Sequence, residues 1–197
     1  IAARKGVRTQ ITGRQALAYV QKLRASVDAI LMGANTIRVD DPQLNVRDRK
    51  KKQPLRIVLS KSGKVDRKSR IFRTRGGRVV VLSVETRLIA SLQDITKQIY
   101  RLGVRRLLVE GGAQVFAQFL KSNLVNEWHV ITAPVRIGSN GVSVFGSSVV
   151  CHPSSVERIK KKGFVVKEKK MLGKDELIVF KKNGGRRHVE TSARRHV

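Results

Sequence analysis

Two segments of the chain place acidic residues and glycines downstream of apolar runs. Asp40 and Asp41 lie in the segment 33–47, which follows the apolar residues 29–32. Glu110 ends a second apolar run and is followed by two glycines. Open α/β sheets bind their ligands at the carboxyl ends of strands. We therefore expect the two segments to lie at the ends of two strands of one sheet and to form one binding site.

The adjacent carboxylates of Asp40 and Asp41 admit several roles. They could bind a metal ion, act as an acid/base pair, or accept hydrogen bonds from a ribose or an amide. The metal interpretation lacks a supporting cluster, because the four histidines are scattered through the second half of the chain. Asp41 precedes Pro42 and could equally initiate a turn. The pair therefore predicts a site without fixing its chemistry.

The glycines that follow Glu110, Gly111 and Gly112, predict a close approach between the backbone and a ligand. Glycine has no Cβ, so a ligand can come near the main chain. A helix that begins just beyond would offer free N–H groups to a phosphate. A plain tight turn would give the same sequence, and the combination with the Asp40 segment favours the binding interpretation.

Basic side chains flank both segments. Arg24 closes a predicted helix and Arg47 closes the Asp40 segment, so both could bind a phosphate or a carboxylate. In so basic a chain, either could also be an ordinary surface residue. Lys61 and Ser62 follow a predicted strand and could contact a cofactor, although a hairpin turn would explain them as well.

Hydrophobic periodicity predicts the elements that carry these residues. Thr12 and Gln15 have the spacing of a capping box at the start of the first helix. The predicted helices span residues 13–26, 86–102 and 113–123. The predicted strands span residues 28–33, 56–60, 78–83, 105–110, 128–132, 164–166 and 176–180, the last two as an antiparallel pair. This order predicts a mixed α/β sheet in one domain, residues 1–180, followed by a basic, disordered tail, residues 181–197.

The net charge of +28, from 42 basic and 14 acidic residues, predicts attraction to anions. The excess is large in residues 48–80, with 13 basic and 2 acidic residues, and in residues 151–197, with 14 and 5. Nucleotide phosphates, phosphorylated substrates and RNA are the candidate anions, and a merely soluble surface is the alternative. With six Phe, two Tyr and one Trp, the chain lacks the stacking platforms of single-strand binders.

Several other classes of protein are disfavoured. The chain has no Gly-x-Ser-x-Gly, Walker or Gly-x-Gly-x-x-Gly motif, so it offers no candidate nucleophile or dinucleotide fingerprint. Its single cysteine, Cys151, cannot form an intramolecular disulfide and fits a reducing compartment. No apolar run approaches the roughly 20 residues of a membrane helix. We expect a protein without a membrane partner, in the cytoplasm or, in a plant, in the plastid stroma.

These segments, in this order, resemble the reductase domain of the bifunctional riboflavin-biosynthesis deaminase/reductase. The most specific match is Asp-Asp-Pro-Gln-Leu-Asn-Val-Arg at residues 40–47, combined with Val-Glu-Gly-Gly-Ala at residues 109–113. Further matches lie at residues 11–12, 24, 28–31, 35–36, 56–59, 119–120 and 124–127. The resemblance covers most of residues 1–135.

The resemblance implies a dihydrofolate-reductase-like α/β fold, with a mostly parallel mixed sheet flanked by helices and antiparallel C-terminal strands. It also implies the NADPH-dependent reduction of 5-amino-6-(5-phosphoribosylamino)uracil to its ribitylamino product. A hydride would pass from nicotinamide C4 to ribose C1′. Positioning of the two carbons would supply most of the catalysis, the chemistry would belong to the cofactor, and no catalytic side chain is assigned.

Site residues follow from the same resemblance, position by position. Together with Lys61, the expected NADPH-binding residues are Thr36, Asp40, Gly112, Ala113, Gln114, Val115 and Phe116. The expected substrate-binding residues are Arg24, Leu44, Arg47 and Glu110, with the arginines at the phosphate end of the phosphorylated pyrimidine. The resemblance also suggests a homodimer.

The chain departs from the family pattern in three respects. The family's first strand, with its Ser-x-Asp-Gly-Lys/Arg element, would precede Ile1, so we expect this sequence to lack it. Arg8 and Gln10 replace a Ser and a Trp. The zinc deaminase signatures do not occur in residues 1–197, as we would also expect of a stand-alone reductase. With the net charge, these departures motivate a second hypothesis, an inactive reductase-derived scaffold that binds RNA through basic loops and tail. The retained Thr36, Asp40, Arg47 and Glu110 favour the reductase.

Overall fold

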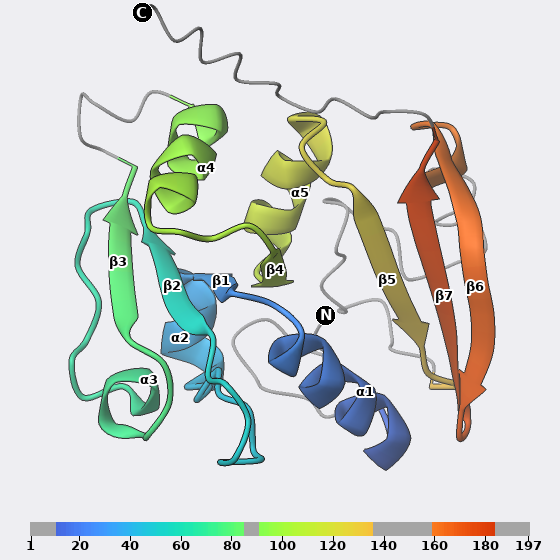
Figure 1. Ribbon diagram of the computed structural model, residues 1–197, viewed down its shortest axis with the longest axis horizontal. Coiled ribbons are helices and arrows are strands. Elements are labelled where there is room, and N and C mark those ends of the chain that lie inside the picture. The colour runs from blue at the N-terminus through green and yellow to red at the C-terminus, as the bar shows by residue number, and fades with distance from the viewer. Residues whose placement is uncertain (1–10, 85–90, 136–158, 184–197) are drawn as a thin grey trace, which may run out of the picture.

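The computed structural model describes residues 11–84, 91–135 and 159–183, in which helices and strands alternate up to the fifth strand and two further strands follow (Figure 1). The helices are α1 (Arg14–Ala25), α2 (Ala34–Asp40), α3 (Arg70–Arg73), α4 (Leu92–Arg101) and α5 (Ala113–Lys121). The strands are β1 (Ala29–Gly33), β2 (Leu55–Ser60), β3 (Val79–Ser83), β4 (Leu107–Gly111), β5 (Glu127–Thr132), β6 (Phe164–Leu172) and β7 (Asp175–Lys182).

The described strands form two sheets. A parallel sheet has the order β3-β2-β1-β4, and an antiparallel sheet has the order β5-β7-β6. In Figure 1 the parallel sheet and the antiparallel sheet lie on opposite sides of the molecule, with α1 and α5 between them. The predicted fold class, a mostly parallel sheet flanked by helices with antiparallel C-terminal strands, is confirmed.

Strand β1 divides the core into two layers. Its side chains alternate between the faces of the sheet, as the pleat requires. Ala29 and Leu31 pack in one cluster with residues of α4 and α5, and Ile30 and Met32 pack in another with Ile37 of α2 and a residue of α3. Because all five residues of β1 are buried, their apolar run predicted the strand correctly.

The start of α1 differs from the prediction. The N-cap residue is Gly13, and no side chain caps the helix, so the predicted capping box of Thr12 and Gln15 is wrong. Instead, the Gly13 N–H donates a 2.7 Å hydrogen bond to Oδ2 of Asp175, a buried carboxylate at the start of β7. A carboxylate that is distant in sequence therefore accepts from the start of the helix, in place of the predicted Thr12 side chain.

Two short helices, α2 and α3, were not predicted from the sequence. Helix α2 begins directly after β1, so Asp40 lies one helix beyond the strand rather than at its end. Helix α3 lies in the connection between β2 and β3, which are parallel neighbours. The alternative hairpin turn after Lys61 is therefore wrong, since a parallel pair needs a crossover connection.

The C-terminal hairpin is confirmed and longer than predicted. Strands β6 and β7 pair antiparallel across the turn at Gly173 and Lys174. Strand β7 runs to Lys182, two residues past the predicted domain boundary at residue 180. The rest of the predicted tail, the predicted helical residues 86–90, and Arg8 and Gln10 lie outside the described residues.

Candidate functional site

The carboxyl ends of β1 and β4 meet at one edge of the parallel sheet. The two strands are parallel neighbours, with Met32 of β1 paired to Gly111 of β4 after a register shift. A Cβ at Gly33 would lie 2.9 Å from Cγ2 of Val115, and a Cβ at Gly111 would lie 2.8 Å from Cε of Met32. Glycines therefore allow the ends of β1 and β4 and the start of α5 to pack closely.

Thr36 and Gly112, both predicted to bind NADPH, lie side by side. Gly112 has a φ of 94°, which favours glycine. A Cβ at this position would lie 3.0 Å from Oγ1 of Thr36. The Thr36 hydroxyl on α2 therefore lies close to the main chain at the start of α5, and any side chain on Gly112 would crowd it.

The amino-terminal end of α5 offers unpaired backbone donors. Gly112 is the N-cap residue and provides no side chain, and the first hydrogen bond of the helix runs from the Phe116 N–H to the Gly112 carbonyl oxygen. The N–H groups of Ala113, Gln114 and Val115 have no backbone acceptor among the described residues. The first turn of α5 also contains no acidic residue. This helix end can therefore accept a phosphate.

The side chains that follow differ in what they can do. Gln114 is exposed, whereas Val115 is buried in the core cluster below the sheet edge. The Phe116 ring packs against Trp128, with 6.1 Å between ring centroids. Val115 and Phe116 can therefore contribute backbone groups to the site, while their side chains stabilise the position of α5.

Asp40 and Lys61 complete the predicted cofactor residues. Asp40 is the last residue of α2 and is half-buried, and its carboxylate makes no hydrogen bond or ion pair with other described residues. Lys61 is exposed and directly follows β2, the other neighbour of β1. Both residues stay predictions. Asp40 lies four residues after Thr36 on α2, so the two share one face of that helix.

Arg24 and Glu110 form a bidentate ion pair. The Arg24 Nε and Nη2 atoms donate to the two Glu110 carboxylate oxygens at 2.7 and 2.6 Å. The side chains are 16% and 12% exposed, so the pair is largely withdrawn from water. Arg24 Nη1 also donates to the Asn45 carbonyl oxygen at 3.1 Å. Three of five guanidinium N–H groups are therefore used within the protein, and Arg24 is not a free phosphate clamp.

The segment 41–47 has an unusual backbone. Asp41 and Leu44 have φ values of 40° and 50°, in the left-handed region that non-glycine residues rarely adopt. Asp41 caps α2, and its Oδ1 accepts a 2.7 Å hydrogen bond from the Arg70 N–H at the start of α3. The interpretation of Asp41 as a turn residue therefore accounts for its contacts. Leu44 is fully buried in the core cluster beside α2.

The four predicted substrate residues come together around this segment. Arg24 bonds to Glu110 and to the residue after Leu44. Arg47 is exposed, and its N–H donates to Oε1 of Gln21 at 2.8 Å. Gln21 and Arg24 lie three residues apart on α1, so they share one face of that helix. The four predicted substrate residues thus lie close to α1, and their role in binding the substrate stays a prediction.

Two residues that the sequence did not single out hold the same segment. The Gln53 side chain bonds to both backbone groups of Val46, accepting from its N–H at 2.9 Å and donating to its oxygen at 3.0 Å. Arg56 is 4% exposed, and it donates to the carbonyl oxygens of Gln43 and Gly77 at 3.1 and 2.7 Å. Burial lowers the pKa of Arg56. A charged residue inside the apolar run 55–59 was the signal that could have identified it.

A titratable cluster joins α1 to the antiparallel sheet. The Tyr19 hydroxyl lies 2.8 Å from Nδ1 of His129, and Nε2 of His129 lies 3.5 Å from the Glu127 carboxylate. Burial lowers the pKa of His129, against the opposing effect of Glu127, and burial raises the pKa of Tyr19. The cluster lies away from the predicted site residues and contributes to packing.

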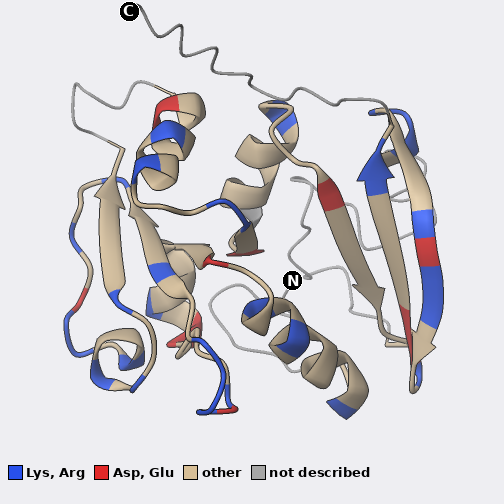
Figure 2. Ribbon diagram, viewed as in Figure 1, with Lys and Arg blue, Asp and Glu red and all other residues tan. Residues whose placement is uncertain are grey.

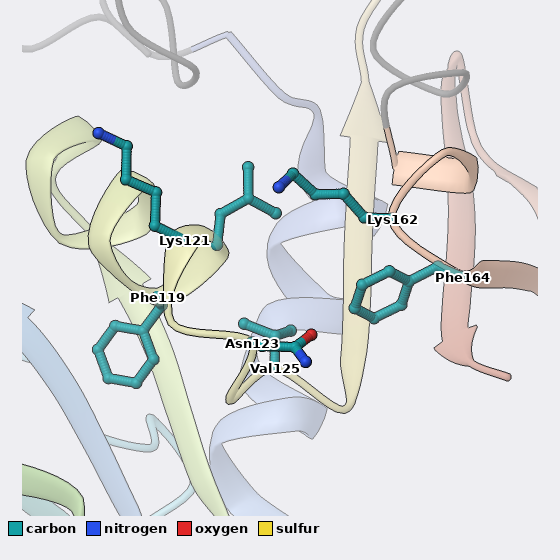
Figure 3. Close-up of a pocket in the computed structure, with 7 residues that line it drawn as sticks. Phe119, Lys121, Asn123, Val125, Lys162 and Phe164 are labelled. Carbon is teal, nitrogen blue, oxygen red and sulfur yellow. The ribbon is translucent and has the colours of Figure 1, made fainter. Parts of the chain in front are cut away.

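A hollow of about 220 Å³ lies at the other end of α5 (Figure 3). Lys121 and Lys162 both line it, and in this view the Lys162 side chain points inward from the segment before β6 while that of Lys121 extends away from the end of α5. None of the predicted site residues lines it. Among the described residues, no helix is long and apolar enough to span a membrane, and no group of three or more His, Cys, Asp or Glu could hold a metal ion.

Comparison with known proteins identifies relatives over most of the chain. Residues 1–165 match the family model of the RibD C-terminal domain. A 2,5-diamino-6-ribosylamino-4(3H)-pyrimidinone 5′-phosphate reductase of Archaeoglobus fulgidus is 30% identical over 189 residues, covering 80% of this chain and 86% of the relative. The riboflavin biosynthesis protein RibD of Chlamydia trachomatis is 31% identical over 164 residues, covering 71% of this chain and 44% of the relative.

Solved structures share the fold. The deaminase/5-amino-6-(5-phosphoribosylamino)uracil reductase of Thermotoga maritima superposes with a TM-score of 0.69 at 23% identity, covering 86% of this chain and 49% of that one. RibD of Acinetobacter baumannii superposes with a TM-score of 0.68 at 24% identity, covering 90% and 52%. At these identities the likeness shows the fold alone. The chain spans about half the length of these RibD proteins.

Proposed function

This chain belongs to the RibD C-terminal domain family, and we propose that it is an NADPH-dependent reductase of riboflavin biosynthesis. Its substrate would be a ribosylaminopyrimidine 5′-phosphate. We infer the uracil form, 5-amino-6-(5-phosphoribosylamino)uracil, from the match to the RibD C-terminal domain, although the Archaeoglobus relative is named for the 2,5-diaminopyrimidinone. The observation that carries the proposal is the meeting of Thr36 with Gly112 beside the open end of α5.

The residues at the end of β4 fit a dinucleotide phosphate. A Cβ on Gly112 would lie against the Thr36 hydroxyl, so a residue with a side chain at this position would block the approach of a phosphate to the backbone. The N–H groups of residues 113–115 would hold the phosphate, with a favourable helix dipole. Lys61 would add a positive charge from the end of β2. NADPH, when bound, supplies a hydride to the substrate carbon.

The half of the site around α1 would hold the pyrimidine substrate. The Arg24–Glu110 pair fixes both side chains in one orientation, which removes the entropy cost of ordering them on binding. Glu110 retains acceptor capacity beyond its two bonds to Arg24 and would accept from substrate hydroxyl or amine groups. Arg47 is exposed, and its N–H is held by Gln21; its guanidinium would bind the phosphate.

The experiment is a fluorescence titration of NADPH into the purified chain, followed by turnover with each of the two pyrimidine phosphates. Asp40→Asn should weaken NADPH binding by about tenfold, because it removes a charged acceptor that has no donor among the described residues. Asp66→Asn is the matched control, since the exposed Asp66 carboxylate accepts only from the Lys68 N–H. Binding without turnover of either substrate would refute the activity, and absence of NADPH binding would refute the cofactor.

A further inference from the structure

We propose that the amino edge of the parallel sheet carries a second binding surface, for the phosphate backbone of double-stranded nucleic acid. The surface consists of exposed basic residues in the loops before β2 and before β3, and we call it the amino-edge surface. Its members are Arg49, Lys50, Lys51, Lys52, Arg67, Lys68, Arg70, Arg73, Arg75 and Arg78. Figure 2 shows the basic segments gathered around α3 and the loop below β2.

The two loops lie against each other. A Cβ on Gly77 would lie 1.9 Å from the Pro54 carbonyl oxygen, so the backbones of the two loops are in direct contact there. Arg56 Nε donates to the Gly77 oxygen at 2.7 Å, and Asn45 Nδ2 donates to the Arg75 oxygen at 3.1 Å. These bonds hold the backbone that carries the basic side chains, so the charges are presented on an ordered scaffold.

The positive charge of the surface is not neutralised by carboxylates. Among the described residues, only Lys52 of the ten has a carboxylate partner, Asp28, at 3.4 Å. The two acidic residues inside these loops, Asp48 and Asp66, accept from the backbone N–H groups of Lys50 and Lys68 instead. A cluster of unpaired like charges repels itself. A polyanion would relieve that repulsion and release its own counterions.

The lysines of β6 give the opposite case. Lys167, Lys169 and Lys170 are also exposed, but each lies 2.6–3.3 Å from a glutamate carboxylate, those of Glu127, Glu176 and Glu168 respectively. The positive charge on the hairpin is therefore compensated locally. The contrast separates the amino-edge surface from basic residues that only keep a protein soluble.

The surroundings favour a nucleic-acid duplex over other polyanions. None of the exposed large apolar side chains of the described residues lies in these loops, so the surface has nothing to insert into a lipid layer. The nearest aromatic ring, Phe72, is half-buried and has the Arg67 guanidinium over it at 4.7 Å, so no ring is free to stack on an unpaired base. Six of the ten residues are arginines, which suit phosphate oxygens.

The test is fluorescence anisotropy with a labelled RNA duplex, a DNA duplex of equal length, and the corresponding single strand, over a range of salt. The chain should bind the duplexes with a log–log salt slope of about −4 to −5, corresponding to about five phosphate contacts. The triple variant Arg49→Gln, Lys50→Gln, Lys51→Gln should weaken binding by about tenfold at low salt and make the slope shallower by about 2 to 3.

The matched control is the triple variant Lys167→Gln, Lys169→Gln, Lys170→Gln, which removes the same formal charge from the hairpin. Its duplex affinity should change by less than about twofold, since those lysines are already paired. Equal losses in both triple variants would overturn the proposal, because net charge alone would then account for binding. Tighter binding to the single strand, or to anionic phospholipid vesicles with the same loss in the Arg49 variant, would also overturn it.

Discussion

The two edges of the parallel sheet are built in opposite ways. At the carboxyl edge, Gly33, Gly111 and Gly112 let the ends of β1 and β4 pack closely against α2 and α5, and the open end of α5 offers backbone N–H groups. At the amino edge, long cationic side chains cover the loops, and of these only the side chain of Lys52 has a carboxylate partner among the described residues. The difference teaches that net charge and the proposed small-molecule site are separate features of this protein. Close backbone packing at glycines distinguishes the proposed cofactor site, and positive charge distinguishes the proposed nucleic-acid surface.

The largest effect should come from adding a single methyl group at the carboxyl edge. Gly112→Ala should lower NADPH affinity by at least about tenfold, because the Cβ approaches Thr36 and the backbone is held at φ 94°. Gly103→Ala is the control: its φ is 87°, but no atom lies within 4 Å of the added Cβ. Both variants should lose about 1 kcal/mol of unfolding free energy, and only the first should lose NADPH affinity.

That pair of glycine variants decides whether the bare main chain at the carboxyl edge matters for binding. If Gly103→Ala weakened NADPH binding as much as Gly112→Ala, the loss would reflect global stability. The proposal that NADPH binds at the carboxyl edge beside Gly112 would then be contradicted. Calorimetric titration and denaturant unfolding of the same samples would separate the two quantities.

A smaller effect is expected at the Arg24–Glu110 pair, which lies in the proposed substrate half of the site. Glu110→Gln should lower the free energy of unfolding by about 2 kcal/mol, because it removes a charge-assisted bidentate pair that is largely withdrawn from water. Glu176→Gln breaks an exposed pair with Lys169, whose side chain is 62% exposed, and should cost less than about 1 kcal/mol. Urea unfolding measures both.

The outcome also bears on the substrate. Glu110→Gln should raise the KM for the pyrimidine phosphate, while Glu176→Gln should leave it unchanged. If Glu110→Gln lowered stability without any change in KM, the Arg24–Glu110 pair would have only a structural role. The proposed location of the substrate beside this pair would then be wrong.

The smallest effect concerns pH and lies away from both edges. The pKa of His129 is lowered from its ordinary value of 6.5 by burial, so the folded protein binds this proton less readily than the unfolded chain. The stability contribution of neutral His129 is present above pH 6.5 and is lost as the pH falls from there through the lowered pKa. The groups around the ring are Tyr19, Glu127, Lys167 and Glu168.

His129→Gln should therefore flatten the fall in unfolding free energy below pH 6.5. Thermal unfolding across that range would measure it, and NADPH affinity in the variant should stay at its original value. An unchanged pH profile would show that the imidazole titrates alike in both states.

Much of the architecture could be predicted from local sequence signals, and the exceptions have physical causes. The apolar run of β1 and the periodicity of α5 were sufficient, because burial of one face fixes each element. Helix α2 has only seven residues and follows the N-cap residue Gly33. Its hydrophobic periodicity is therefore too short to predict a helix. The predicted cap at Thr12 failed because its competitor, Asp175, is distant in sequence.

The candidate site was predictable in its members but not in their arrangement. Family resemblance named Arg24 and Glu110 as two substrate contacts, while the structure joins them to each other. Gln53 and Arg56 hold the 41–47 segment through backbone carbonyl and amide groups. Since any residue can offer such groups, the acceptors could not be predicted, and only the charge of Arg56 inside an apolar run indicated that this residue has a buried role.

The hydrogen bond from the Gly13 N–H to Asp175 spans 162 residues of chain. During synthesis, α1 would emerge long before its acceptor exists, because residue 175 is translated only after all four parallel strands have left the ribosome. Contacts of such long range form late and slow folding. Until then, the first turn of α1 would lack this acceptor, while Gln21 and Arg24 farther along the helix could already bond to Arg47 and Glu110. A nascent chain of this protein therefore needs nearly its full described length before the start of its first helix is fixed.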